Sequence, residues 1–213
     1  MQRILITAGP TFEPIDPVRF LGNHSTGKMG FAIAEVCANE GAEVILISGP
    51  VSLETKNKTI KLIRVQTAAE MYAECVNIFS SCNAAILSAA VADFSPLETL
   101  SKKVKREKSD WSITFKPTKD IAAELGILKT KSQVLAGFAL ETDNELNNAK
   151  EKLKRKNLDF IVLNSMNDEG AGFGTDTNKI SIIDKNNNID KFELKSKQEV
   201  AVDIVNKLIA LIK

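Results

Sequence analysis

Short apolar runs alternate with amphipathic segments along most of the chain. Four to six consecutive apolar or β-branched residues predict strands that are buried on both faces. Apolar residues three and four positions apart predict helices that bury one face. The predicted strands are 3–7, 44–47, 60–65, 84–87, 111–115, 134–139 and 160–163. The predicted helices are 29–38, 67–80, 119–125, 142–156 and a last one that follows Ser196.

Local signals support the helix ends. Three pairs of residues have capping-box spacing, in which a hydroxyl side chain precedes a Glu by three positions. These pairs are Thr67 with Glu70, Thr142 with Glu145, and Ser196 with Glu199. Gly41 follows the first amphipathic segment as its expected C-terminal cap.

Alternation of strands and helices predicts the fold class. We expect an α/β protein with a Rossmann-like, doubly wound, mostly parallel sheet and helices on both faces. Two segments, 179–183 and 189–193, flank three asparagines and predict an antiparallel hairpin near the C-terminus. We interpret 1–213 as one domain, with an irregular stretch through Gly22 and a mobile, Lys- and Glu-rich lid loop at about 95–110.

The fold class predicts where a ligand binds. In doubly wound sheets, ligands sit beyond the carboxyl ends of the strands. The segments that follow strands here are 8–30, 88–106, 137–143 and 164–174, and the last of these contains a glycine-rich stretch at 170–174.

Composition narrows the function classes. The 213 residues carry 28 Lys+Arg and 27 Asp+Glu, a net charge of +1, so no nucleic-acid partner is expected. No apolar run is long enough for a membrane span, and the N-terminus lacks signal-peptide features, so we expect a cytoplasmic protein. Three cysteines without CxxC spacing suit a reducing compartment, and with His24 as the one histidine no side-chain metal cluster is expected.

Two nucleotide-binding motifs are matched incompletely. Residues 22–29, GNHSTGKM, resemble a P-loop, but Met29 stands where a hydroxyl would bind magnesium. Ser25, Thr26 and Gly27 still sit at a predicted helix N-terminus, where free N–H groups favour an anion. A dinucleotide fingerprint is absent after the first strand, and no acidic residue follows the second, which disfavours a nicotinamide dehydrogenase.

Seven segments together are more specific than any one of them. They are TAGPT (7–11), DPVRFLGNHSTGKMG (16–30), SAAVADF (88–94), KVKR (103–106), KDI (119–121), GFALET (137–142) and KRKNLDFIVLN (154–164). In this order and spacing they resemble phosphopantothenoylcysteine synthetase, the phosphopantothenate–cysteine ligase of coenzyme A biosynthesis. Bacterial members commonly have KxKK at 103–106 and NPDI at 118–121, where this chain has KVKR and TKDI. It resembles a stand-alone form, without the flavin-dependent decarboxylase domain.

The resemblance implies a reaction in two steps. The carboxylate of 4'-phosphopantothenate attacks the α-phosphorus of a nucleoside triphosphate, CTP rather than ATP in most bacterial members, and pyrophosphate leaves. The amine of cysteine then attacks the acyl-cytidylate, which gives the amide and CMP. Magnesium accompanies the nucleotide, no flavin is implied, and the expected assembly is a homodimer.

The resemblance also assigns residues. Asn23 and Lys103 are the expected catalytic residues, with Lys103 also on the nucleotide. The other expected nucleotide contacts are Asp93, Lys119, Asp120, Ile121, Ala122, Phe138, Lys152 and Lys156. The expected substrate contacts are Arg19, Asn23, Ala89 and Ala90.

Each assignment has a structural alternative. The lysines can be solvated surface residues, Asn23 a loop former, Asp93 a loop cap and Phe138 a core residue. Arg19 can pair with Asp16 or Glu13. At the level of function, the alternatives are an NAD(P)-dependent oxidoreductase and a nucleotide-binding module without catalysis.

Overall fold

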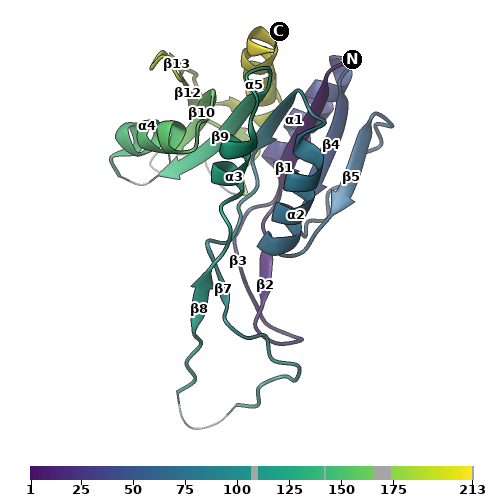
Figure 1. Cartoon of the computed structure of the whole chain (residues 1–213), viewed down its shortest axis with the longest axis vertical. Helices are drawn as coiled ribbons and strands as arrows, with labels where there is room; N and C mark the ends of the chain where they lie inside the picture. Colours follow the sequence, from purple (N-terminus) through teal and green to yellow (C-terminus); the bar gives the residue numbers. More distant parts are fainter. Residues whose placement is uncertain (107–109, 142, 166–173, 213) are drawn as a thin grey trace.

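A central sheet of eight strands forms the body of the protein (Figure 1). The computed structural model describes residues 1–106, 110–141, 143–165 and 174–212. The strand order is β13-β12-β10-β9-β6-β1-β4-β5. The bounds are β1 Arg3–Ala8, β4 Glu43–Ser48, β5 Ile60–Arg64, β6 Ala84–Leu87, β9 Val134–Glu141, β10 Phe160–Ser165, β12 Ile180–Asp184 and β13 Ile189–Lys191.

The pairing confirms the predicted fold class. Strands β5, β4, β1, β6, β9 and β10 are parallel, and the connections between them are helical or long crossovers. Strands β12 and β13 join this sheet antiparallel through the predicted hairpin. The central strands are apolar along their length because helices cover both of their faces.

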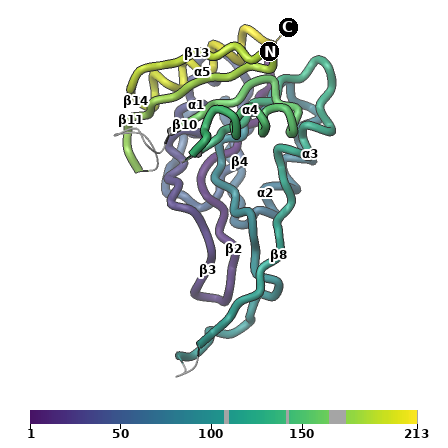
Figure 2. Tube along the Cα trace, turned by 90° about the vertical axis from the view of Figure 1, so that its left-hand side faces the viewer, coloured from purple at the N-terminus to yellow at the C-terminus, as the bar shows by residue number. Residues whose placement is uncertain are grey.

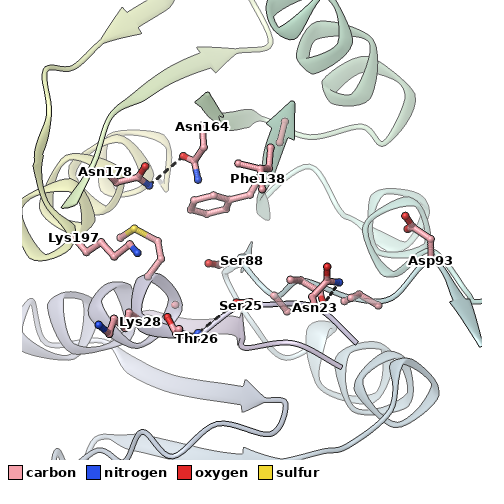
Figure 3. A pocket seen from close by; sticks show the side chains of 18 of the residues that line it. Asn23, Ser25, Thr26, Lys28, Ser88, Asp93, Phe138, Asn164, Asn178 and Lys197 are labelled. Carbon is pink, nitrogen blue, oxygen red and sulfur yellow. Dashed lines mark hydrogen bonds between the residues drawn. The ribbon is translucent and has the colours of Figure 1, made fainter. Parts of the chain in front are cut away.

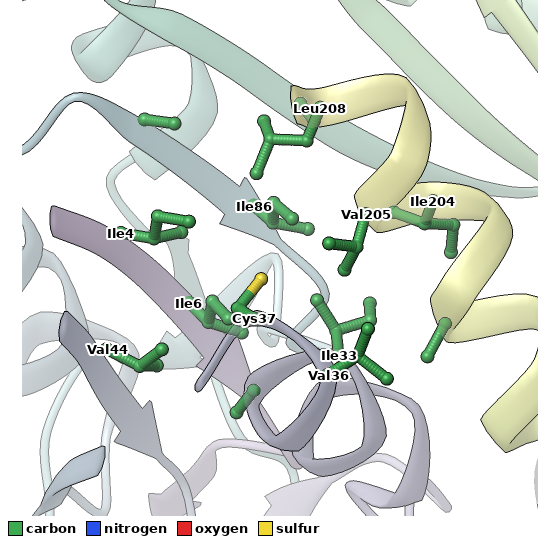
Figure 4. Packing of buried hydrophobic residues seen from close by; sticks show 14 of the residues in the cluster. Ile4, Ile6, Ile33, Val36, Cys37, Val44, Ile86, Ile204, Val205 and Leu208 are labelled. Atoms are coloured by element: carbon green, nitrogen blue, oxygen red, sulfur yellow. The ribbon is translucent and has the colours of Figure 1, made fainter. Parts of the chain in front are cut away.

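Helices cover both faces of the sheet, and each covered face forms a separate hydrophobic core. On one face lie α1, Lys28–Asn39, and α5, Lys197–Leu211, which pack against each other and the sheet. Figure 4 shows their aliphatic side chains meeting those of β1, β4 and β6, with Ile33 and Val205 between the layers. On the other face lie α2 (Ala68–Phe79), α3 (Ile121–Leu128) and α4 (Glu145–Arg155).

Two short hairpin-like pairs project from the body as an arm (Figures 1 and 2). Strand β2, Phe12–Pro14, pairs antiparallel with β3, Phe20–Gly22, and β7, Phe94–Pro96, pairs antiparallel with β8, Phe115–Pro117. The expectation of an irregular stretch through Gly22 was therefore wrong. A further small pair joins β11, Thr177–Asn178, to β14, Lys195–Ser196.

The predicted strand 111–115 was also wrong. Residues 111–114 are not in a strand. Pairing begins at Phe115, because the three residues of β7 pair with Phe115–Pro117. The expected lid loop, about 95–110, begins within β7, and its residues 107–109 lie outside the described part of the chain. Most of the glycine-rich stretch at 170–174 also lies outside it.

Helix starts agree with two of the three predicted capping boxes. The boxes at Thr67 and Ser196 are both complete. The fourth helix instead begins after Asn144, which adopts a left-handed conformation at φ 44° that asparagine tolerates well, while Thr142 lies outside the described residues. Within the described ranges, every helix is too short or too polar to cross a membrane.

Candidate active site

The sheet has its switch point between β1 and β6, since the chain builds outward from β1 to β4 on one side and returns to β6 on the other. A cavity of about 330 Å³ lies beyond the carboxyl ends of these strands, where such folds bind ligands. It is lined by Asn23, Ser25, Thr26, Gly27, Lys28, Met29, Gly30, Ser88, Ala89, Ala90, Val91, Asp93, Phe138, Ala139, Leu140, Lys152, Asn164, Asn178 and Lys197 (Figure 3).

The N-terminus of α1 forms one wall of this first cavity. Its N-cap is Gly27 in a left-handed conformation, φ 77°, with no side-chain cap, and its first turn holds no acidic residue. Gly30 lets the helix approach β1 closely, because a Cβ there would lie 2.5 Å from the Cβ of Ala8. The predicted helix N-terminus at 25–27 is thus confirmed, and it faces the cavity with N–H groups suited to an anion.

Backbone hydrogen bonds hold the loop after β6 at the opposite wall. The N–H of Ala89 donates to Oγ1 of Thr7 at 3.1 Å, and the N–H of Ala90 donates to the carbonyl of Gly9 at 2.9 Å. The side-chain amide of Asn23 donates to the carbonyl of Ala90 at 3.2 Å. Asn23 and the two alanines therefore lie together, as the family resemblance implies.

A second cavity of about 290 Å³ adjoins the first. The two share the side chains of Ala89, Val91, Asp93, Phe138 and Lys152. The second is also lined by Thr7, Leu87, Thr118, Lys119, Asp120, Ile121, Ala122, Gly137, Lys156 and Leu158. Eight residues expected on the nucleotide thus line this one depression. They are Asp93, Lys119, Asp120, Ile121, Ala122, Phe138, Lys152 and Lys156.

Charged side chains organise the floor of the second cavity. Asp120 caps α3 by accepting a hydrogen bond from the N–H of Ala123, and it pairs with Lys156 at 2.9 Å. Burial acts to raise the pKa of Asp120, but the Lys156 and Ala123 hydrogen bonds outweigh it and lower the pKa. Lys119 lies 4.6 Å from the ring centre of Tyr72 in a cation–π contact.

Two expected residues, Arg19 and Lys103, line neither cavity of their own chain. Arg19 donates from Nε to Oδ2 of Asp16 at 2.9 Å, which is the ion pair offered as its alternative, and from Nη2 to the carbonyl of Val104 at 2.9 Å. The N–H of Val104 in turn donates to Asp16 at 3.3 Å. The segment that carries Lys103 is therefore bound to the arm.

The family model for the C-terminal domain of DNA/pantothenate metabolism flavoproteins matches residues 1–211. The chain belongs to this family. That membership confirms the resemblance to phosphopantothenoylcysteine synthetases drawn from the seven segments.

Relatives of this flavoprotein C-terminal domain are longer proteins. A cysteine/cysteine sulfinic acid decarboxylase from an unknown prokaryotic organism is 59% identical over 99% of the chain, which covers 59% of that protein. The coenzyme A biosynthesis bifunctional protein CoaBC of Bacillus subtilis is 44% identical over the whole chain, which covers 52% of it. The chain thus spans little more than half the length of these curated relatives.

A solved structure of the same family has the same fold. The crystal structure of the C-terminal domain of a coenzyme A biosynthesis bifunctional protein CoaBC is 39% identical to this chain, with a TM-score of 0.82. The match covers 97% of this chain and 93% of the solved chain. A DNA/pantothenate metabolism flavoprotein from Streptococcus pneumoniae, 22% identical with a TM-score of 0.86, agrees in fold.

Sequence reasoning missed part of the flavoprotein C-terminal domain's cavity. Asn178 and Lys197 were not expected there, and Lys28 was considered only within the incomplete P-loop. Both lysines occupy the first position of a helix, α1 or α5. Cations are unfavourable at the N-terminal end of a helix dipole. Lysine at this position was the sequence signal that could have pointed to both residues. His24 is exposed and lies outside both linings.

Proposed function

We propose that the protein joins 4'-phosphopantothenate to L-cysteine, driven by CTP in preference to ATP, as a cytoplasmic step of coenzyme A biosynthesis. The observation that carries this proposal is the convergence of residues from four distant segments on one depression. Asn23, Ala90, Asp93, Phe138 and Lys152 line the first cavity although they are far apart in sequence. They are also residues that the family resemblance assigns to the two reactants.

The proposed chemistry needs positive charge and hydrogen-bond donors. An attacking carboxylate and a triphosphate repel each other, so groups that neutralise the phosphates lower the barrier. In our proposal Lys152 and Lys156 hold the nucleotide in the second cavity, and the α1 N-terminus faces the phosphates. Asn23 donates its amide N–H to the acyl oxygen as negative charge develops there. The cysteine amine then attacks the acyl carbon, and CMP leaves with the former carboxylate oxygen.

Magnesium fits this arrangement as a partner of the nucleotide. Mg²⁺ prefers oxygen ligands and is usually held by substrate phosphates together with one or two carboxylates. Asp93 lines both cavities and would hold the ion beside those phosphates. When bound, the ion would neutralise charge on the phosphates.

The arm supports the proposal of a homodimer. Five large apolar side chains on it are 40% to 53% exposed, and exposed apolar surface can mark a site of protein–protein contact. They are Phe20, Phe94, Leu97, Trp111 and Phe115. Because Lys103 and Arg19 lie outside the cavities of their own chain, we propose that the arm of one subunit delivers them to the site of the other. Closure of the segment at 95–110 over the nucleotide stays a prediction.

Pyrophosphate release tests the proposed ligase. We expect release only when CTP, Mg²⁺ and phosphopantothenate are all present, and amide formation once cysteine is added. ATP, GTP and UTP in place of CTP should release less. Asn23→Ala should slow amide formation by ~10²-fold with an unchanged melting temperature, whereas the neighbouring exposed His24→Ala should not. CTP binding without turnover would instead indicate a binding module, and NAD(P)H fluorescence changes would favour the oxidoreductase.

Mixing two inactive variants tests the delivery of Lys103 by a second subunit. Lys103→Gln is altered on the arm and Asn23→Ala in the cavity, so each mixed dimer would contain one intact site. Equal mixing with free exchange should restore about a quarter of wild-type activity. Activity no greater than that of the separate variants, in a sample shown by sedimentation to contain mixed dimers, would contradict an arm that acts between subunits.

A further inference from the structure

Two lysines converge at the end of the first cavity that lies away from Asp93 (Figure 3). Lys28 is the first residue of α1 and Lys197 is the first residue of α5. The ammonium of Lys28 pairs with Asp176 at 2.6 Å, and that of Lys197 donates to the carbonyl of Thr175 at 2.5 Å. None of these residues has a role in the proposed chemistry described above.

Positively charged groups gather at this end of the cavity. Two ammonium groups lie beside two helix N-termini, each of which carries a partial positive charge. Among the described residues, Asp176 partly offsets them with a side chain that is 85% exposed, and Glu199 caps the start of α5. Lys197 is 9% exposed, and its burial, followed by the charge of nearby Lys28, lowers its pKa. A cation buried beside another cation and a helix N-terminus is costly unless an anion joins them.

A phosphate group matches these donors better than a carboxylate or an apolar group would. It offers three or more acceptor oxygens and up to two negative charges, which two ammonium groups and the N–H groups at the uncapped start of α1 can bind together. The amide side chains of Asn164 and Asn178, joined by a hydrogen bond of 3.3 Å, lie over the same end of the cavity. They add neutral polar groups at which phosphate oxygens can be bound.

We propose that Lys28 and Lys197 bind the terminal phosphate of a reactant, and that Asp176 holds Lys28 in place until that phosphate arrives. The assignment of the reactant rests on the proposed function. Two sources share this chemistry: the pyrophosphate end of the nucleotide and the 4'-phosphate of phosphopantothenate. In both cases the phosphate displaces Asp176 from Lys28 without a covalent change.

Calorimetry with inorganic pyrophosphate tests the phosphate site without depending on ligase activity. We expect wild-type protein to bind the probe, and Lys28→Met and Lys197→Met each to weaken binding by about tenfold or more. Lys131→Met, at an exposed lysine in the turn before the amino end of β9, is the matched control and should bind as wild type does. Circular dichroism melts show whether each variant folds. If Lys197→Met does not fold, the pyrophosphate affinity of Lys28→Met decides the test.

The variant Asp176→Asn separates a ligand site from a merely structural cluster. If Asp176 competes with phosphate for Lys28, its neutralisation should tighten pyrophosphate binding several-fold. If the ion pair only braces the start of α5, the same change should leave binding unchanged or weaken it. Absence of pyrophosphate binding by wild type, equal binding by Lys28→Met and Lys131→Met, or weaker binding by Asp176→Asn would each overturn the proposal.

Steady-state kinetics then identify the source of the phosphate. A rise in KM for CTP alone in Lys28→Met assigns the site to the nucleotide, and a rise for phosphopantothenate alone assigns it to the 4'-phosphate. Unchanged KM for both would overturn the proposal. If wild type proves inactive as a ligase yet binds pyrophosphate through Lys28, the proposed function fails while the phosphate site stands.

Discussion

Gly30→Ala is a sharp test of the close contact between α1 and β1. The added Cβ would lie 2.5 Å from Cβ of Ala8 and 3.0 Å from the carbonyl oxygen of Thr7, whereas ordinary contacts begin at 3.4 Å. The helix must therefore move by roughly 1 Å. Alanine gains about 1 kcal/mol of helix propensity, but overpacking costs ~1–3 kcal/mol, so we expect a net loss of up to ~2 kcal/mol of stability.

The same movement should affect function more than stability. It displaces the helix N-terminus that faces the proposed phosphates, and a misplacement of about 1 Å can cost ~10²-fold in rate. Urea unfolding and pyrophosphate release measure the two effects. Asn39→Ala, at the exposed far end of α1, controls for propensity alone. Ala8→Gly combined with Gly30→Ala removes one of the clashing atoms and should recover part of the activity.

A more stable Gly30→Ala protein with wild-type turnover would refute this reasoning, because the contact would then be accommodated without moving the helix. Equal loss in the single and double variants would place the effect elsewhere than at the contact with Ala8.

Three further predictions concern the rest of the molecule. Lys156→Met should weaken CTP binding by about tenfold in calorimetry, whereas its exposed neighbour Lys154→Met should not. Asp159→Asn should cost about 3 kcal/mol in urea unfolding at pH 7, because it leaves the largely buried Lys129 without its carboxylate partner. Burial acts to raise the pKa of Asp159, but hydrogen bonds and ion pairs lower it, so wild type should lose this advantage as pH falls below about 4. Burial raises the pKa of Cys37 and Cys75 to about 12, so thiol reagents at pH 8 should label them only after unfolding.

The sequence alone predicts the elements that bury a continuous apolar face. Residues 84–87 and 44–47 are apolar throughout because both faces are covered, and the structure places both in the central sheet. Strands β2 and β3 of the arm were missed because each is only three residues long. The three residues of β3 are all exposed and carry no apolar alternation, so no local signal reveals the pairing with β2.

The residues of the candidate site also divide into those that the sequence predicts and those that it does not. Residues in loops after strands, such as Asn23 and Ala90, were predictable because the fold class directs such loops to one edge. Lys197 was not, because it lies in a helix start that the hairpin and β14 bring to the cavity from the other end of the chain. The position of Lys103 outside both cavities depends on the hydrogen bonds of Val104 to Arg19 and Asp16. The pattern of charges along the sequence does not predict these backbone hydrogen bonds.

Packing between the first and last helices has a consequence for biosynthesis. Because α5 follows every strand of the sheet along the chain and packs against α1, a nascent chain can pair β1, β4 and β6 well before α5 is available. Until α5 has emerged from the ribosome, α1 would keep an apolar face open to solvent, and the wall that carries Lys197 would be missing from the cavity. Chaperones that recognise exposed aliphatic surface would meet this intermediate, and ligand capture would require α5 to be in place.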